Sequence, residues 1–154
     1  MISMQIDWSG MASVLIDTNL LVYVYDQNAP VKQRRAIEVL ERVRSDHTGV
    51  ITAQVLSEFY AVATRKLSPP LTPAQAEAQL QIFSLQWPVF PVTEAVVLLA
   101  ARGAQKHQIH FWDAQIWAAA RLHGITLVYS ENFNSGAVIK GVRLVNPLTE
   151  TGYL

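Results

Sequence analysis

Residues 13–19 read Ser-Val-Leu-Ile-Asp-Thr-Asn, so that a short apolar segment leads directly into an acid and two small polar residues. We interpret residues 13–16 as a buried strand that ends at Asp17. A lone carboxylate among apolar residues is costly to bury unless something compensates its charge. This stretch therefore predicts an element of a layered fold and, at its end, a carboxylate that needs a partner.

Three further acids occupy comparable places in the chain. Glu58 lies inside the apolar segment 55–60, Asp113 follows Phe111-Trp112, and Glu131 comes after the apolar segment 126–129 and Ser130. Hard divalent cations bind carboxylate oxygens. Acids set close together also repel one another, which favours a bound cation over an empty site. The four acids therefore predict one shared metal site.

Strands and helices are expected to alternate along the chain. The expected strands are 13–16, 50–52, 89–92, 126–129 and 142–145, the last of them at an edge of the sheet. The expected helices are 20–25, 30–44, 53–66, one that opens at Thr72-Pro73, 93–107 and 111–123. Such alternation predicts an α/β fold, a central and mostly parallel sheet between two helical layers. Ligands of such sheets collect beyond the carboxyl ends of the strands, where the four acids would converge.

The composition bounds the class of protein. A chain of 154 residues with 51% hydrophobic and 16% charged residues suits one globular domain, which we expect at 12–148, with a loose extension at 1–11 and a tail at 149–154. Met1, Met4 and Met11 are alternative starts. The absence of cysteine excludes thiolate metal sites, disulfides and thiol catalysis. A net charge of zero argues against avid nonspecific nucleic-acid binding but leaves a local basic face open.

Neither a signal peptide nor a membrane-spanning segment is evident, so we expect a cytoplasmic protein without a membrane partner. The chain also lacks a G-x-S-x-G elbow, a P-loop and a G-x-G-x-x-G turn, the signatures of serine hydrolases, NTPases and dinucleotide-binding proteins.

Four motifs, taken in order, resemble those of PIN-domain proteins, the fold of the VapC-type toxin ribonucleases. They are Ile-Asp-Thr-Asn-Leu-Leu-Val-Tyr at 16–23, Ser-Glu-Phe at 57–59, Phe-Trp-Asp-Ala at 111–114 and Ser-Glu-Asn-Phe at 130–133. The resemblance covers about residues 13–147. It implies a metal-dependent endoribonuclease that uses Mg²⁺ or Mn²⁺, with Asp17, Glu58 and Asp113 as its acidic positions. For a toxin it further implies an antitoxin that blocks the site, and a homodimer.

The fourth motif departs from the family pattern. The family usually has an aspartate where this chain has Asn132, and a neutral amide oxygen adds no charge to a metal site. Glu131 could take the fourth position instead, and the sequence leaves both residues open. Thr18, Asn19 and Ser130 are expected to hydrogen-bond an acid or a metal-bound water.

Two other interpretations remain open. The first is a PIN-fold binding module with weak or no catalysis, which Asn132 favours. The second is a zinc site formed by His107, His110 and Asp113, which the expected helix break at 108–110 disfavours. Exposed basic residues are candidate RNA contacts or simply solvated helix faces; they are Lys32, Arg34, Arg35, Arg42, Arg44, Arg65 and Lys66.

Overall fold

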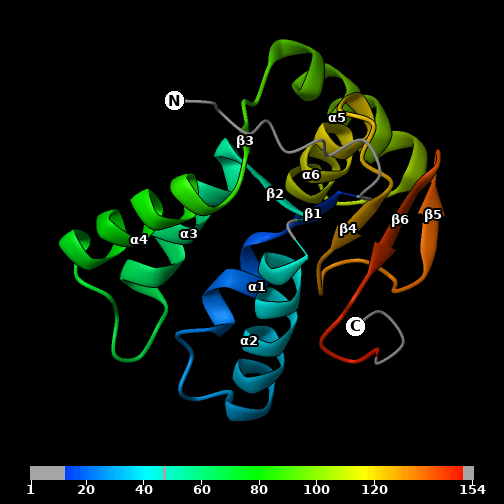
Figure 1. Ribbon diagram of the computed structural model, residues 1–154. Helices are drawn as coiled ribbons and strands as arrows, with labels where there is room; N and C mark the ends of the chain where they lie inside the picture. The colour runs from blue at the N-terminus through cyan, green and yellow to red at the C-terminus, as the bar shows by residue number, and fades with distance from the viewer. Residues whose placement is uncertain (1–12, 47, 151–154) are drawn as a thin grey trace, which may run out of the picture.

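The structure is a computed structural model that describes residues 13–46 and 48–150, and a six-stranded sheet lies at its centre (Figure 1). The strands run in the order β3-β2-β1-β4-β6-β5. Their bounds are β1 Val14–Ile16, β2 Gly49–Thr52, β3 Val89–Phe90, β4 Leu127–Tyr129, β5 Ala137–Ile139 and β6 Val142–Val145. All neighbouring strands pair in parallel except β5, which is antiparallel to β6.

The described residues form six helices in total, which cover the two faces of this sheet (Figure 1). They are α1 Thr18–Tyr23, α2 Pro30–Ser45, α3 Ala53–Arg65, α4 Pro73–Gln86, α5 Glu94–His107 and α6 Phe111–Leu122. Threonines begin three of them: Thr52 accepts a hydrogen bond from the third backbone N–H of α3, Thr93 does so for α5, and Thr72 forms a capping box with Gln75 at α4. Of the part of the chain that is described, no helix is both long and apolar enough to cross a membrane.

Strand β1 is the central strand and is buried on both faces. Val14, Leu15 and Ile16 all lie in the core, between β2 and β4. An apolar run without alternation is what a parallel strand covered by helices on both sides requires. The chain leaves β1 at Asp17, so this acid emerges at the carboxyl edge of the sheet, next to the end of β4.

The predicted α/β domain with a central, mostly parallel sheet is confirmed. The prediction that residues 142–145 form an edge strand is wrong, because β6 lies between β4 and β5. The edge strands are β3 and β5, and β5 lies in a segment whose many turn residues gave no indication of a strand. The predicted strand at 89–92 is shorter, ending at Phe90. The expected extension at 1–11, with its three alternative starts, lies outside the described residues, as do residues 151–154 of the expected tail.

A close approach between α5 and α6 yields a test of the packing. A Cβ added at Gly103 would lie 2.4 Å from Cζ3 of Trp117. We expect Gly103→Ala to lower the free energy of unfolding by about 1–3 kcal/mol, the usual cost of overpacking a core. This would occur although alanine is favoured over glycine in a helix by about 1 kcal/mol. Urea denaturation followed by circular dichroism measures the change.

The matched control is Gly103→Ala made in a Trp117→Leu background. There the smaller side chain removes the clash, so the alanine should stabilise the protein relative to Trp117→Leu alone. A Gly103→Ala protein as stable as the wild type would contradict the contact between these two helices.

Candidate active site

Asp17 is the most buried of the predicted site acids. It follows β1, caps α1 and is 2% exposed. Its carboxylate accepts hydrogen bonds from the Thr18 backbone N–H at 2.8 Å and from Ser130 Oγ at 2.7 Å. Ser130 is fully buried and follows β4, the neighbour of β1 in the sheet. The ends of two adjacent strands therefore hold this acid in one orientation.

Glu58 faces the same region from α3. Its carboxylate accepts a hydrogen bond from Thr18 Oγ1 and another from Gln54 Nε2, both at 2.8 Å. Gln54 also donates to the Trp112 carbonyl oxygen at 3.0 Å and accepts from Gln115 Nε2 at 2.7 Å. These contacts tie the start of α3 to the start of α6.

Asp113 lies in the first turn of α6 and is half-buried. Its Oδ1 accepts a hydrogen bond from Asn132 Nδ2 at 3.2 Å. The amide of Asn132 thus faces the site, which it reaches from the loop after β4. The Asn132 backbone N–H donates to Ser130 Oγ at 3.1 Å, so the loop is anchored to the hydroxyl that also binds Asp17.

The three acids interact electrostatically. Burial raises the pKa of Asp17 to about 6, and the charges of Glu58 and Asp113 add to that rise, against the hydrogen bonds from Ser130 and Thr18. Burial also raises the pKa of Asp113, with a contribution from Glu58, while Asn132 and the charge of His110 oppose it. The fold therefore brings three mutually repelling carboxylates to the carboxyl edge of the sheet.

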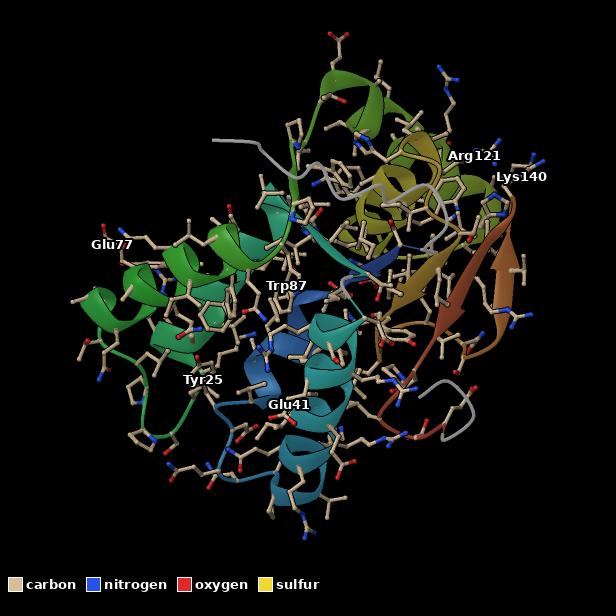
Figure 2. The ribbon with its side chains drawn as sticks, viewed as in Figure 1. Tyr25, Glu41, Glu77, Trp87, Arg121 and Lys140 are labelled. Carbon is tan, nitrogen blue, oxygen red and sulfur yellow. The ribbon has the colours of Figure 1, made fainter. Side chains whose placement is uncertain are left out.

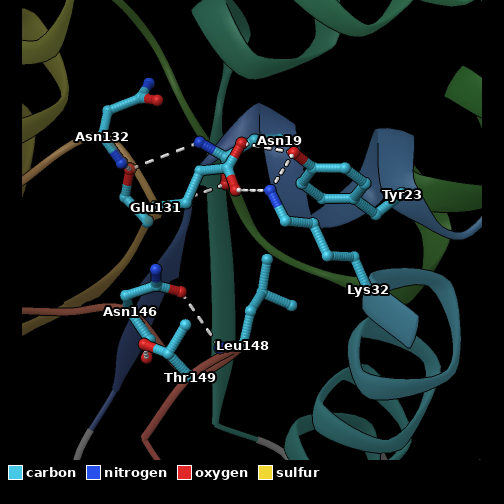
Figure 3. A network of polar contacts seen from close by, with 9 residues as sticks. Asn19, Tyr23, Lys32, Glu131, Asn132, Asn146, Leu148 and Thr149 are labelled. Carbon is cyan, nitrogen blue, oxygen red and sulfur yellow. Dashed lines mark hydrogen bonds and ion pairs between the residues drawn. The ribbon is translucent and has the colours of Figure 1, made fainter. Parts of the chain in front are cut away.

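Glu131 takes a different direction from its neighbour Asn132. Its carboxylate accepts hydrogen bonds from Tyr23 OH at 2.5 Å and from Lys32 Nζ at 3.1 Å, and Lys32 also donates to Tyr23 OH at 3.1 Å (Figure 3). These contacts raise the pKa of Lys32, the bond to Tyr23 contributing most. Asn19 links this group to the buried acids, because it donates to Ser130 Oγ and accepts from the Glu131 backbone N–H, both at 3.4 Å.

A cleft of about 400 Å³ opens at this place. Asp17, Glu58 and Asn132 line its inner part, and Tyr23 and Glu131 line it beside α1. An adjoining groove takes in Asp113 and Asn132 from the other side. All eight predicted site residues thus gather around one end of the sheet, and their roles there remain predictions.

The chemical type of these side chains suits a hard cation, but the spacing between them does not. They are carboxylates and one amide oxygen, and the buried charge of Asp17 is poorly compensated by hydrogen bonds alone. Within residues 13–46 and 48–150, however, no three His, Asp or Glu side chains lie close enough together to hold a metal ion. Glu58 is instead held by Thr18 and Gln54. A cation would fit here only if the three carboxylates moved closer together.

The alternative zinc face is not formed. His107 ends α5 and packs edge-on against Trp117, while His110 precedes α6, so the two histidines lie on either side of a break. Sequence reasoning missed Gln54 and Gln115, the buried amides behind the acids. Gln115 stands alone among apolar residues of α6, and this isolation was the available signal for a buried polar contact.

Comparison with known proteins agrees with this geometry. The family model of the PIN domain matches residues 14–134. A toxin–antitoxin complex from Klebsiella pneumoniae superposes with a TM-score of 0.65 at 21% identity, over 88% of this chain and 98% of that one. VapC20 of Mycobacterium tuberculosis, a toxin that cleaves the sarcin–ricin loop, gives a TM-score of 0.62 at 18% identity, over 85% and 99%.

A third solved structure, VapBC2 from Rickettsia felis bound to a DNA fragment from its promoter, gives a TM-score of 0.61 at 17% identity, over 85% of this chain and 96% of that one. No curated protein sequence matches the chain significantly. At these identities the solved structures are evidence of the shared fold. The predicted resemblance to the PIN-domain family is confirmed.

The raised pKa of Asp17 predicts how stability depends on pH without metal. A carboxyl whose pKa is higher in the folded protein than in the unfolded one stabilises the fold below its unfolded pKa, near 4, and loses that contribution as pH rises past about 6. In EDTA we therefore expect Asp17→Asn to raise the free energy of unfolding at pH 7.5 by about 1–3 kcal/mol. The difference should vanish near pH 4. Urea titrations between pH 4 and 8 measure it.

Ser130→Ala provides the opposite variant, because it removes a hydrogen bond that lowers the pKa of Asp17. Its stability should fall more steeply than that of the wild type over the same range. If Asp17→Asn keeps the wild-type dependence on pH, the burial of this charge is not what limits stability.

Proposed function

The chain belongs to the PIN domain family, and from that premise we propose that it is a divalent-metal-dependent endoribonuclease, the toxin of a toxin–antitoxin pair. The observation that carries the proposal is the convergence of Asp17, Glu58 and Asp113 at one sheet edge, where Glu58 raises the pKa of both aspartates. Phosphodiester hydrolysis needs positive charge near the phosphate and an activated water. Three carboxylates that repel one another at one sheet edge suit the binding of a cation that meets both needs.

Each residue then has a distinct role. Asp17, Glu58 and Asp113 hold Mg²⁺ or Mn²⁺, which when bound lowers the pKa of a water and neutralises phosphate charge. Asn132 contributes a neutral oxygen in place of a fourth acid. Thr18, Asn19 and Ser130 orient the carboxylates through the hydrogen bonds described above, as partners behind metal ligands do.

The sequence left either Glu131 or Asn132 as the fourth metal ligand, and we propose Asn132. Its amide contacts Asp113, whereas Glu131 is held by Tyr23 and Lys32. We assign Glu131 to keeping Lys32 beside the cleft, where an ammonium group offsets the charge of an approaching phosphate. Glu131 is then a positioning residue and not a metal ligand.

The partners follow from the same family. Similar structures are toxin–antitoxin complexes, which supports an antitoxin that covers the acidic cleft. An apolar groove beside α2 and α4 is a suitable surface for it (Figure 2). Tyr25, Phe83 and Trp87 line this groove, and the buried Trp87 Nε1 finds no acceptor in the described part of the chain.

A homodimer and a cytoplasmic location complete the proposal. Trp112 is 54% exposed and stands over a hollow lined by Ala53, Ala61 and Val92. An exposed aromatic side chain over an apolar surface is typical of interfaces between protein chains. We assign this surface to the contact between two copies of the chain.

One observation favours a second function. Asn132 removes a charge from the site, and the acids of the described residues are not spaced as a ready-made metal site. A PIN-fold module that binds RNA or protein without cleaving it would need no such spacing. The following experiment separates the two functions.

The purified protein should cleave single-stranded RNA in Mg²⁺ or Mn²⁺ and not in EDTA. Asp113→Asn should slow cleavage by about 100-fold or more, since losing the cation forfeits several kcal/mol of transition-state stabilisation. Glu77→Gln, a change to an exposed acid on α4, is the matched control and should cleave normally. Single-turnover gel assays with end-labelled RNA measure the rates. Activity that survives EDTA and Asp113→Asn would point to another nuclease, and inactivity with varied RNAs in both metals would favour the binding module.

Asn132→Asp tests the fourth position. A charge about 4 Å from the cation is worth about 4 kcal/mol at a dielectric constant near 20, most of which desolvation offsets, so Mn²⁺ should bind roughly tenfold more tightly. Without metal, the new carboxylate replaces a donor to Asp113, so Tm should fall. Calorimetric titration and thermal unfolding measure the two effects.

Glu131→Gln is the control for the same loop. It should leave Mn²⁺ affinity within about twofold, because Glu131 contacts Lys32 and Tyr23 and not the other acids. A larger loss of affinity than Asn132→Ala causes would reverse the assignment and make Glu131 the metal ligand.

A further inference from the structure

Three cations from separate elements gather where β5 turns into β6 (Figure 2). They are Lys106 in the last turn of α5, Arg121 in the last turn of α6 and Lys140 at the tip of the hairpin. Arg121 Nη1 donates to the Lys140 carbonyl oxygen at 2.7 Å. The nearby ammonium of Lys106, and more weakly Arg121, lowers the pKa of Lys140. None of the ion pairs formed by the described residues includes any of the three.

The hairpin adopts an unfavourable backbone conformation at Lys140. Lys140 has φ 49° and Gly141 has φ 82°, and Ile139 pairs with Val142 across them. A two-residue turn with both φ values positive prefers asparagine, aspartate or glycine at the first position. Lysine is strained there and also approaches two other cations. A bound anion would offset the repulsion between these cations.

A groove runs from the acidic site to the chain neighbours of two of these cations. It has a volume of about 460 Å³ and runs between the end of α5 and β5. Its lining includes Asp113 and Asn132 of the acidic site, and also His107 and Ile139, the chain neighbours of Lys106 and Lys140. Phe133, the residue after Asn132, lines the groove as well. The two charged regions of the protein are thus connected along its surface.

We propose that this groove and the cluster of Lys106, Arg121 and Lys140 form a track for one strand of RNA, with the cluster binding phosphates a few nucleotides away from the cleaved bond. The inference rests on the proposed function, because it names how the substrate of that same site is held. Cations along a groove with apolar, aromatic and amide surfaces are the features that single-stranded nucleic acids require.

The dimensions suit a short piece of RNA. Asp113 and Arg121 are eight residues apart on α6, which corresponds to about 12 Å along the helix axis. An extended single strand spaces its phosphates more widely than the axial rise of about 3.4 Å in a duplex, so fewer than about four nucleotides span this distance. The track also compensates for the acids of the cleft, which repel phosphates until a cation binds.

The test measures RNA binding in an Asp17→Asn background, so that binding is read without cleavage. The variant Lys106→Gln/Lys140→Gln is compared with Arg34→Gln/Arg42→Gln, which loses the same charge from the exposed face of α2. The probes are a fluorescein-labelled 20-nucleotide RNA of mixed sequence and a labelled trinucleotide. Fluorescence anisotropy is recorded between 50 and 300 mM KCl. Thermal unfolding checks that each variant is folded, and removing the repulsion at Lys140 should not lower Tm.

We expect the double lysine variant to bind the 20-nucleotide RNA about tenfold more weakly at 0.1 M salt, and the slope of log K against log salt to fall by about 1.4, for two lost phosphate contacts at about 0.7 each. The trinucleotide, which makes few phosphate contacts, should bind every one of the proteins more weakly than the 20-nucleotide RNA does. The arginine control should bind the long RNA within about twofold of its parent. Equal losses in the two double variants, or no loss in the lysine variant, would overturn the track.

Cleavage by the proteins that retain Asp17 separates this inference from the proposed function. If the wild type cleaves RNA but the lysine variant binds normally, the function stands and the track fails. If the wild type binds long RNA through the lysines and never cleaves it, the track stands in a binding module and the nuclease proposal fails. Absence of any RNA binding by the Asp17→Asn protein and the wild type would overturn both.

Discussion

The burial of one charged group, the carboxylate of Asp17, is the constraint on which the rest of the site depends. The central strand carries this acid into the core, where Ser130 and the Thr18 backbone N–H are its partners. Two good hydrogen bonds do not compensate the lost hydration, since the pKa still rises to about 6. Glu58 and Asp113 increase the cost. This arrangement lowers the free energy of unfolding near neutral pH. Binding of a proton or a cation would offset that loss.

The positions of the acids depend on one another through a chain of buried polar contacts. Thr18 of α1 donates to Glu58 of α3, Gln54 joins Glu58 to the Trp112 carbonyl of α6, and Gln115 of α6 donates back to Gln54. Each helix that carries an acid is therefore tied to another by hydrogen bonds as well as by packing. Buried polar networks specify a relative placement more sharply than apolar contacts do. The site is consequently set by three helices together, although no single helix contributes more than one acid.

The sequence predicted the layers, and the gathering of the acids at one edge of the sheet, because both depend on local rules. Apolar runs followed by polar residues marked β1 and β4, and parallel strands bring their carboxyl ends to one edge of the sheet. Strand β5 was missed, since it is short, partly exposed and follows a turn-rich segment, and its strand character comes from pairing with β6. The order of strands depends likewise on contacts distant in sequence. Glu131 and Asn132 could not be separated, because the loop backbone decides which adjacent side chain faces the acids.

The cluster of basic residues was also missed from the sequence, because its members are distant along the chain. Sequence reasoning sought RNA contacts among consecutive cations of α2, whereas Lys106, Arg121 and Lys140 lie on three elements and meet only in the folded chain. A net charge of zero argues against strong nonspecific attraction to RNA, and the acidic cleft alone would repel it. The acids and the basic residues lie in different parts of the protein, so zero net charge does not prevent local attraction of RNA. In the proposed arrangement, acids lie where a cation would bind and the basic residues lie beyond the adjoining groove. A protein without net charge would then hold RNA in one direction across this site.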